Sequence, residues 1–116
     1  MNTVLIEVRP LADSMTAFAQ AWESGKPERE ARIRFASFDL LWKTLTPNRM
    51  QLIQALTGAG PTGVRELARR VGRDVRAVHA DCVCLAKTGV IDKLEDGKLL
   101  FPYDGVRVNF EVPKAA

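Results

Sequence analysis

The chain has 116 residues, of which 47% are hydrophobic and 27% charged, values typical of one soluble globular domain. Its formal net charge is +3, and residues 1–46 carry six basic and six acidic side chains, so the whole excess lies in residues 47–116. No secretory signal is visible and no segment approaches the roughly 20 apolar residues that cross a bilayer, so we expect a cytoplasmic protein without membrane association.

The first 36 residues predict a strand, a helix and a second strand. Residues 3–8 and residues 32–35 alternate apolar with polar side chains, which is typical of strands, and the second strand is a candidate to pair with the first. Between them, after Pro10, four apolar residues recur at spacings of four, three and four, on one face of an amphipathic helix. They are Leu11, Met15, Phe18 and Trp22. This stripe either packs on the rest of the protein or forms a homodimer or partner interface, where tryptophan and phenylalanine are frequent.

Three helices are expected next. The first covers residues 37–42, and the third covers residues 64–71, with Thr62 or Gly63 as its N-cap. The second begins at Thr46-Pro47, because threonine is a good N-cap residue and proline is favoured at the first helical position.

A fourth helix is expected over residues 74–88. Gly72 supplies the turn before it, and Asp74 caps its first turn. Five apolar residues recur at spacings of four, three, four and three and predict the side that packs against the preceding helix. They are Val71, Val75, Val78, Cys82 and Leu85. Gly89 has the position and type of a helix C-cap.

The remaining residues predict strands. Asp96-Gly97 favours a two-residue hairpin turn between residues 90–94 and residues 98–101. A last strand is expected over residues 106–112, where apolar and polar side chains alternate again.

The order helix, turn, helix and hairpin is that of a winged helix-turn-helix, which places its second helix in the DNA major groove. Residues 64–88 hold six basic and three acidic side chains, a charge distribution expected of a phosphate-facing surface. The packing stripe leaves Arg73, Arg76 and neighbouring residues facing outward near the start of the second helix. The candidate DNA-binding residues are Arg65, Arg69, Arg70, Arg73, Arg76, Ala77, His79, Ala80, Lys93 and Lys98.

These candidates have different expected roles. Arg73 and Arg76 suit guanine, because a guanidinium donates two hydrogen bonds to its O6 and N7 atoms. Ala77 and Ala80 permit a close approach to the groove floor, where a methyl group of either meets a thymine methyl. The three arginines of residues 64–71 suit backbone phosphates, which carry no sequence information.

Plainer interpretations stay open for the same residues. Exposed arginines are common on any helix, and Glu66 with Arg70 is an ordinary i,i+4 pair. His79 is either a base or phosphate contact or an exposed polar residue. In the hairpin, Asp92, Glu95 and Asp96 repel phosphate, so either the tip stays off the DNA or only its two lysines touch it.

Residues 65–79 followed by residues 85–91 resemble MarR-like winged-helix transcriptional regulators, in particular a group of small bacterial and archaeal proteins assigned to DNA binding. The chain shares flanking motifs with that group at Ala21–Gly25, Leu41–Lys43 and Phe101–Asp104, so the resemblance covers most of residues 11–110. Some members are similar to antitoxins encoded beside a small toxin. The resemblance therefore implies a repressor, with a cognate toxin as a further partner.

The sequence predicts an α+β fold, with a strand-helix-strand extension in residues 1–36 and a winged helix-turn-helix in residues 37–116. We expect a sequence-specific, DNA-binding transcriptional regulator with a recognition helix at residues 74–88 and a wing at residues 90–101. We also expect a homodimer, because a two-fold dimer doubles the number of base pairs read.

Neither catalysis nor a cofactor is expected. The sequence lacks a nucleophile elbow, a glycine-rich phosphate loop and a recognisable carboxylate pair. Cys82 and Cys84 are two residues apart on a helix and there is one histidine, so neither a disulfide between them nor a zinc site is expected. The alternative function is a protein-interaction adaptor or toxin-neutralising module with little DNA binding, because a fold does not settle a function.

Overall fold

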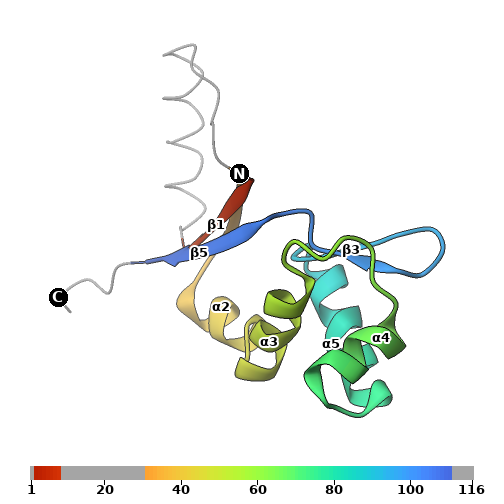
Figure 1. Ribbon diagram of the computed structural model, residues 1–116. Helices are drawn as coiled ribbons and strands as arrows, with labels where there is room; N and C mark the ends of the chain where they lie inside the picture. The colour runs from red at the N-terminus through yellow and green to blue at the C-terminus, as the bar shows by residue number, and fades with distance from the viewer. Residues whose placement is uncertain (1, 9–30, 111–116) are drawn as a thin grey trace, which may run out of the picture.

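The structure is a computed structural model that describes residues 2–8 and 31–110, and these residues form an α+β fold (Figure 1). The strands are β1 (Thr3–Val8), β2 (Ala31–Phe35), β3 (Asp92–Lys93), β4 (Leu99–Leu100) and β5 (Gly105–Asn109). The helices are α2 (Phe38–Thr44), α3 (Pro47–Leu56), α4 (Val64–Val71) and α5 (Val75–Lys87). The predicted helix carrying Leu11, Met15, Phe18 and Trp22 lies outside the described residues. Within the described part of the chain, no helix has the length and apolar character needed to cross a bilayer.

Three strands form a parallel sheet in the order β2-β1-β5. The expected pairing of β1 with β2 is confirmed, and Val4 lies between Ala31 on one side and Val106 on the other. The predicted last strand, 106–112, is confirmed over residues 106–109. It begins one residue earlier, at Gly105, and ends before Phe110, while residues 111–116 lie outside the described part. The sheet thus joins strands from both predicted domains, because β1 and β2 belong to residues 1–36 and β5 to residues 37–116.

Short-range capping signals set where the helices begin. The Thr46 hydroxyl accepts a hydrogen bond from the Arg49 backbone N–H at 3.3 Å, and Pro47 takes the first helical position. The Asp74 carboxylate accepts from the backbone N–H groups of Arg76 at 3.1 Å and Ala77 at 3.3 Å. Both predicted helix starts are therefore confirmed.

Gly72 ends α4 and starts the turn to α5. Its φ of +68° is a left-handed conformation that favours glycine. The backbone N–H of Arg73 donates to the carbonyl of Ala68 at 3.1 Å, which closes the helix end in a Schellman arrangement. The predicted turn is confirmed, and it fixes the angle at which the chain enters α5.

The hairpin differs from the expected two-residue turn. The Leu94 N–H donates to the Lys98 carbonyl at 2.8 Å, so three residues, 95–97, form the loop. Gly97 occupies the last position of this loop, with φ +86°. A three-residue loop requires a left-handed residue at that position, which glycine adopts easily. Asp96-Gly97 therefore forms the last two positions of a three-residue loop and not a two-residue turn. Thr62 exchanges two backbone hydrogen bonds with Leu99, at 2.9 and 2.8 Å, and widens the small sheet.

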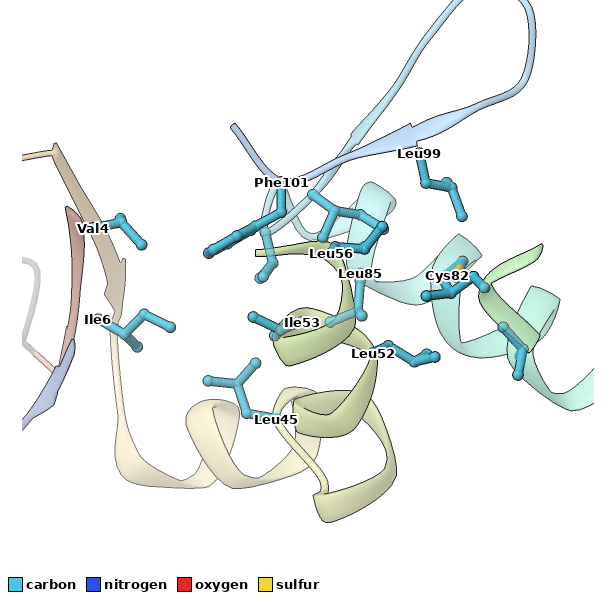
Figure 2. Packing of buried hydrophobic residues seen from close by; sticks show 14 of the residues in the cluster. Val4, Ile6, Leu45, Leu52, Ile53, Leu56, Cys82, Leu85, Leu99 and Phe101 are labelled. Atoms are coloured by element: carbon cyan, nitrogen blue, oxygen red, sulfur yellow. The ribbon is translucent and has the colours of Figure 1, made fainter. Parts of the chain in front are cut away.

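One hydrophobic core connects the parallel sheet to the helices. Figure 2 shows Val4 and Ile6 pointing from β1 toward the side of α3 that carries Ile53. From the other side, α5 contributes part of its predicted stripe, Val78, Cys82 and Leu85, all at most 2% exposed. Val75, at the first position of α5, is 39% exposed and does not share their burial. The packing holds α5 by one side and leaves its opposite side open.

Candidate functional site

The side of α5 opposite the core forms an exposed ridge. Because the helical period is 3.6 residues, the buried residues at positions 78, 82 and 85 place positions 76, 80, 83 and 87 on the far side. We call this the α5 ridge; it consists of Arg76, Ala80, Val83 and Lys87, all exposed. The two cations lie at its ends, about 16 Å apart along the helix axis. Small and apolar side chains occupy its centre.

Arg76 lies in the first turn of α5 and projects from the exposed side. Among the described residues, no acidic side chain forms an ion pair with it. Asp74, the nearest acid in sequence, uses its carboxylate to cap the helix. The guanidinium of Arg76 is therefore available to an external acceptor, as expected from the sequence.

Arg73 has a different position from the one expected. Its Nη2 donates to Asp81 Oδ2 at 2.9 Å, and its side chain is only 19% exposed. The other oxygen of Asp81 accepts from Arg49 Nε at 3.1 Å, and Arg49 Nη1 also donates to the carbonyl of Lys43 at 3.0 Å. The expectation that Arg73 faces outward is wrong, because this residue precedes the N-cap and its direction is not set by the period of α5.

The Asp81 cluster, which we define as Arg49, Arg73 and Asp81, connects three parts of the chain. Arg49 is in the first turn of α3, Arg73 is in the turn after α4, and Asp81 is in the middle of α5. The sequence offered no local signal for the pairing of Arg49 with Asp81, because they are 32 residues apart. The cluster holds the middle of α5, and the turn that precedes α5, against the start of α3.

The α4 arginines are divided between pairing and exposure. Glu66 accepts hydrogen bonds from both Arg69 and Arg70, so the expected i,i+4 pair is confirmed and a second pair adds to it. These bonds lower the pKa of the Glu66 carboxyl and keep it ionised; the bond from Arg69 has the larger effect and the bond from Arg70 the smaller. Arg65 is exposed, and within the described residues no acid pairs with it. Arg70 borders a separate hollow beside Gln51 of α3.

A hollow of about 230 Å³ separates α5 from the β3–β4 hairpin. His79 and Val83 line it from α5, and Lys93 and Gly97 line it from the hairpin. Two predicted site residues from different elements, His79 and Lys93, thus share one concave surface. Lys98 is exposed on the hairpin beside the loop that carries Glu95 and Asp96, so that end keeps its acidic character.

The two cysteines differ in their exposure to solvent. Cys82 is 2% exposed, and desolvation, followed by the charge of Asp81, raises the pKa of its thiol to about 11. Cys84 is half-buried, and neither cysteine forms a disulfide. The described residues contain no group of three or more histidine, cysteine or acidic side chains that suits a metal ion.

A family model described as HVO_A0114 matches residues 44–108, which is more than half of the chain and includes α3, α4, α5 and the hairpin. The searches of curated proteins and of solved structures give no match. The matched segment contains the α5 ridge and the hollow beside it.

Proposed function

The chain belongs to the HVO_A0114 family, and we propose that it is a winged helix-turn-helix protein that binds double-stranded DNA sequence-specifically and represses transcription. In this proposal α4 and α5 are the helix-turn-helix, α5 is the recognition helix, and the β3–β4 hairpin is the wing. The observation that carries it is the α5 ridge, which is open to a partner and has a cation at each end.

The geometry of α5 supports major-groove binding. A recognition helix reads bases mainly through residues near its N-terminus, where Arg76 lies. Its guanidinium suits the O6 and N7 acceptors of guanine. Ala77 and Ala80 are exposed and short, so they permit the helix backbone to come close to the base edges. Arg73 has no part in this contact because Asp81 engages it.

Backbone contacts are supported by the lysines, the histidine and the arginines around the ridge. Lys87 at the far end of the ridge, and His79 with Lys93 in the hollow, suit phosphates on the two sides of the groove. Arg65 suits a further phosphate. Arg69 and Arg70 are already bonded to Glu66, so each would bind phosphate in competition with that carboxylate.

The test is fluorescence anisotropy with the DNA upstream of the protein's own gene and with a scrambled duplex, at low and near-physiological salt. We expect a preference for the native sequence that survives the higher salt. Arg76→Ala should weaken the specific complex by about 1–3 kcal/mol and relax the preference. Arg107→Ala, which removes an exposed arginine of β5, is the matched control. It should change neither the affinity for the native sequence nor the preference over the scrambled duplex. Equal binding to both duplexes by the wild-type protein would contradict the proposal.

A second candidate function, protein binding, is favoured by an aromatic surface formed by Phe38, Trp42 and Phe110. The rings of Phe38 and Trp42 meet Phe110 edge-on at 5.4 and 5.5 Å, yet Trp42 remains 57% exposed. Exposed aromatic clusters are frequent at protein interfaces. We propose that this surface joins two copies of the chain into the homodimer that a palindromic DNA site requires.

Light scattering tests the dimer. The wild-type protein should have the mass of two chains at tens of micromolar, and Trp42→Ala should shift it toward one chain while its circular dichroism stays unchanged. A monomeric wild-type protein with intact DNA binding would overturn the dimer. Retention of a co-expressed small toxin by the wild-type chain but not by Trp42→Ala would favour the toxin-neutralising alternative.

A further inference from the structure

The centre of the α5 ridge has no side chain that can form a hydrogen bond. Ala80 and Val83 occupy it, and Ala77, also exposed, lies beside it. Val83 is 49% exposed, and the buried contacts of α5 are made by other residues, at positions 78, 82 and 85. An exposed helix side normally carries polar residues, and a β-branched valine is a poorer helix former than alanine. Helix propensity does not account for Val83. Its packing at the hollow beside the hairpin leaves about half of the side chain exposed, and that half is open to a partner.

The charges of α5 lie away from this centre. Arg76 and Lys87 occupy the ends of the ridge, while Asp81 is on a flank and is engaged by Arg49 and Arg73. The centre thus presents methyl groups and no formal charge. Any base edge pressed against it loses water without gaining a hydrogen bond from these side chains.

Base edges in the major groove respond differently to such a surface. Cytosine and adenine present an amino group there, and burying it without a partner is unfavourable. Thymine presents a C5-methyl group, the apolar group among the base edges, and burying it against other methyl groups is favourable. An apolar ridge therefore selects thymine by attraction to its methyl group. Because each base pair carries one amino group in the major groove, the ridge discriminates by whether the methyl group or the amino group of a pair lies against it.

We propose that Ala80 and Val83 read thymine methyl groups, so that the preferred half-site places thymine beside the guanine contacted by Arg76. This inference rests on the proposed function, because it requires α5 to lie in the major groove. Ala80 and Val83 are about 6 and 10 Å beyond Arg76 along the helix axis. With about 3.4 Å between base pairs, the selected thymines lie within about three base pairs of that guanine.

The experiment separates the methyl group from the rest of the base. Random duplexes are selected with the wild-type protein, and the enriched sequence is then synthesised with thymidine or with deoxyuridine, which lacks the C5-methyl group. Each methyl removed from the ridge contact should weaken binding about fourfold, and two should weaken it about 15-fold. Deoxyuridine placed outside the half-site should have no effect.

A variant assigns the effect to its side chain. Val83→Ala keeps a good helix former on an exposed position, and it should reduce the preference for thymidine over deoxyuridine. Val108→Ala, which removes a valine of β5 that is 42% exposed, is the matched control and should retain the full preference.

The outcomes distinguish this inference from the proposed function. An enriched sequence that binds equally well with deoxyuridine would overturn the reading of methyl groups and leave sequence-specific binding intact. A methyl effect that is unchanged in Val83→Ala would overturn the assignment to Val83. If no sequence is enriched by the wild-type protein, both the inference and the proposed function fail.

Discussion

Asp81→Asn is the substitution whose effect the structure defines most sharply. The carboxylate of Asp81 accepts from Arg49 at 3.1 Å and from Arg73 at 2.9 Å, one on each oxygen. All three side chains are 18–19% exposed, so solvent screens the pairs only partly. The asparagine keeps one acceptor oxygen, but its amide nitrogen presents donors to the second arginine. One guanidinium thus loses its acceptor while it stays largely out of water.

The expected cost is about 2–3 kcal/mol. A hydrogen bond to a charged group contributes about 1.5–3 kcal/mol, and removal of one partner from a buried ion pair is destabilising by several kcal/mol. The lower part of that range applies because each side chain keeps some exposure and because Arg49 retains its bond to the carbonyl of Lys43. For a domain of this size, the loss is a large fraction of the total stability.

Urea unfolding followed by circular dichroism measures this cost. Asp39→Asn is the matched control, because it removes an ion pair with Lys43 in which both side chains are 72% exposed. That pair should contribute less than about 1 kcal/mol. The reasoning is refuted if Asp81→Asn lowers the free energy of unfolding by no more than Asp39→Asn does.

Three further predictions concern α4, its end and the cysteines. Glu66→Gln should release the paired arginines, strengthen binding to every DNA sequence at low salt and make that binding more sensitive to salt. An unchanged slope of log binding constant against log salt concentration, measured by anisotropy, would contradict this. Gly72→Ala should lower the free energy of unfolding by about 1 kcal/mol in urea titrations, because a side chain is strained at φ +68°; no loss would contradict the assigned conformation. At pH 8, iodoacetamide should modify Cys84 well before Cys82, as peptide mass spectrometry would detect, and equal rates would contradict the burial.

A pH dependence of stability follows from the same thiol. Burial raises the pKa of Cys82 from 9.0 to about 11, so the unfolded chain loses this proton at a lower pH than the folded chain does. The contribution of Cys82 to stability is therefore complete below pH 9 and is lost as the pH rises from 9 to about 11. Cys82→Ala should flatten the fall in urea midpoint over that interval, and an identical fall in both proteins would contradict the assignment.

Local signals in the sequence were sufficient for the helices. Asp74 and Thr46 accept hydrogen bonds from backbone groups two or three residues away, and Gly72 needs only its own φ to end a helix. The stripe of Val78, Cys82 and Leu85 follows from the helical period alone. Because these interactions span a few residues, the exposed side of α5 was predictable, and with it the availability of Arg76.

Interactions between distant residues were not predictable from such signals. The pairing of β5 with β1 joins residues about 100 positions apart, and alternation of apolar residues does not say which strand is the neighbour. The direction of Arg73 depends on its ion pair with Asp81 of α5, which also pairs with Arg49 of α3. The three-residue hairpin loop depends on which carbonyl Leu94 contacts, and the Asp96-Gly97 pair does not specify that choice.

The measurement that tests the central claim most directly is amide hydrogen exchange of the protein with and without the selected duplex. If α5 lies in the major groove, DNA should slow exchange across the first turns of α5 and at the hairpin beside the hollow. Exchange at β2 and at the aromatic surface of Phe38, Trp42 and Phe110 should stay as it is in the free protein. Protection that appears at β2 or α2 and leaves α5 unchanged would contradict the assignment of α5 as the recognition helix.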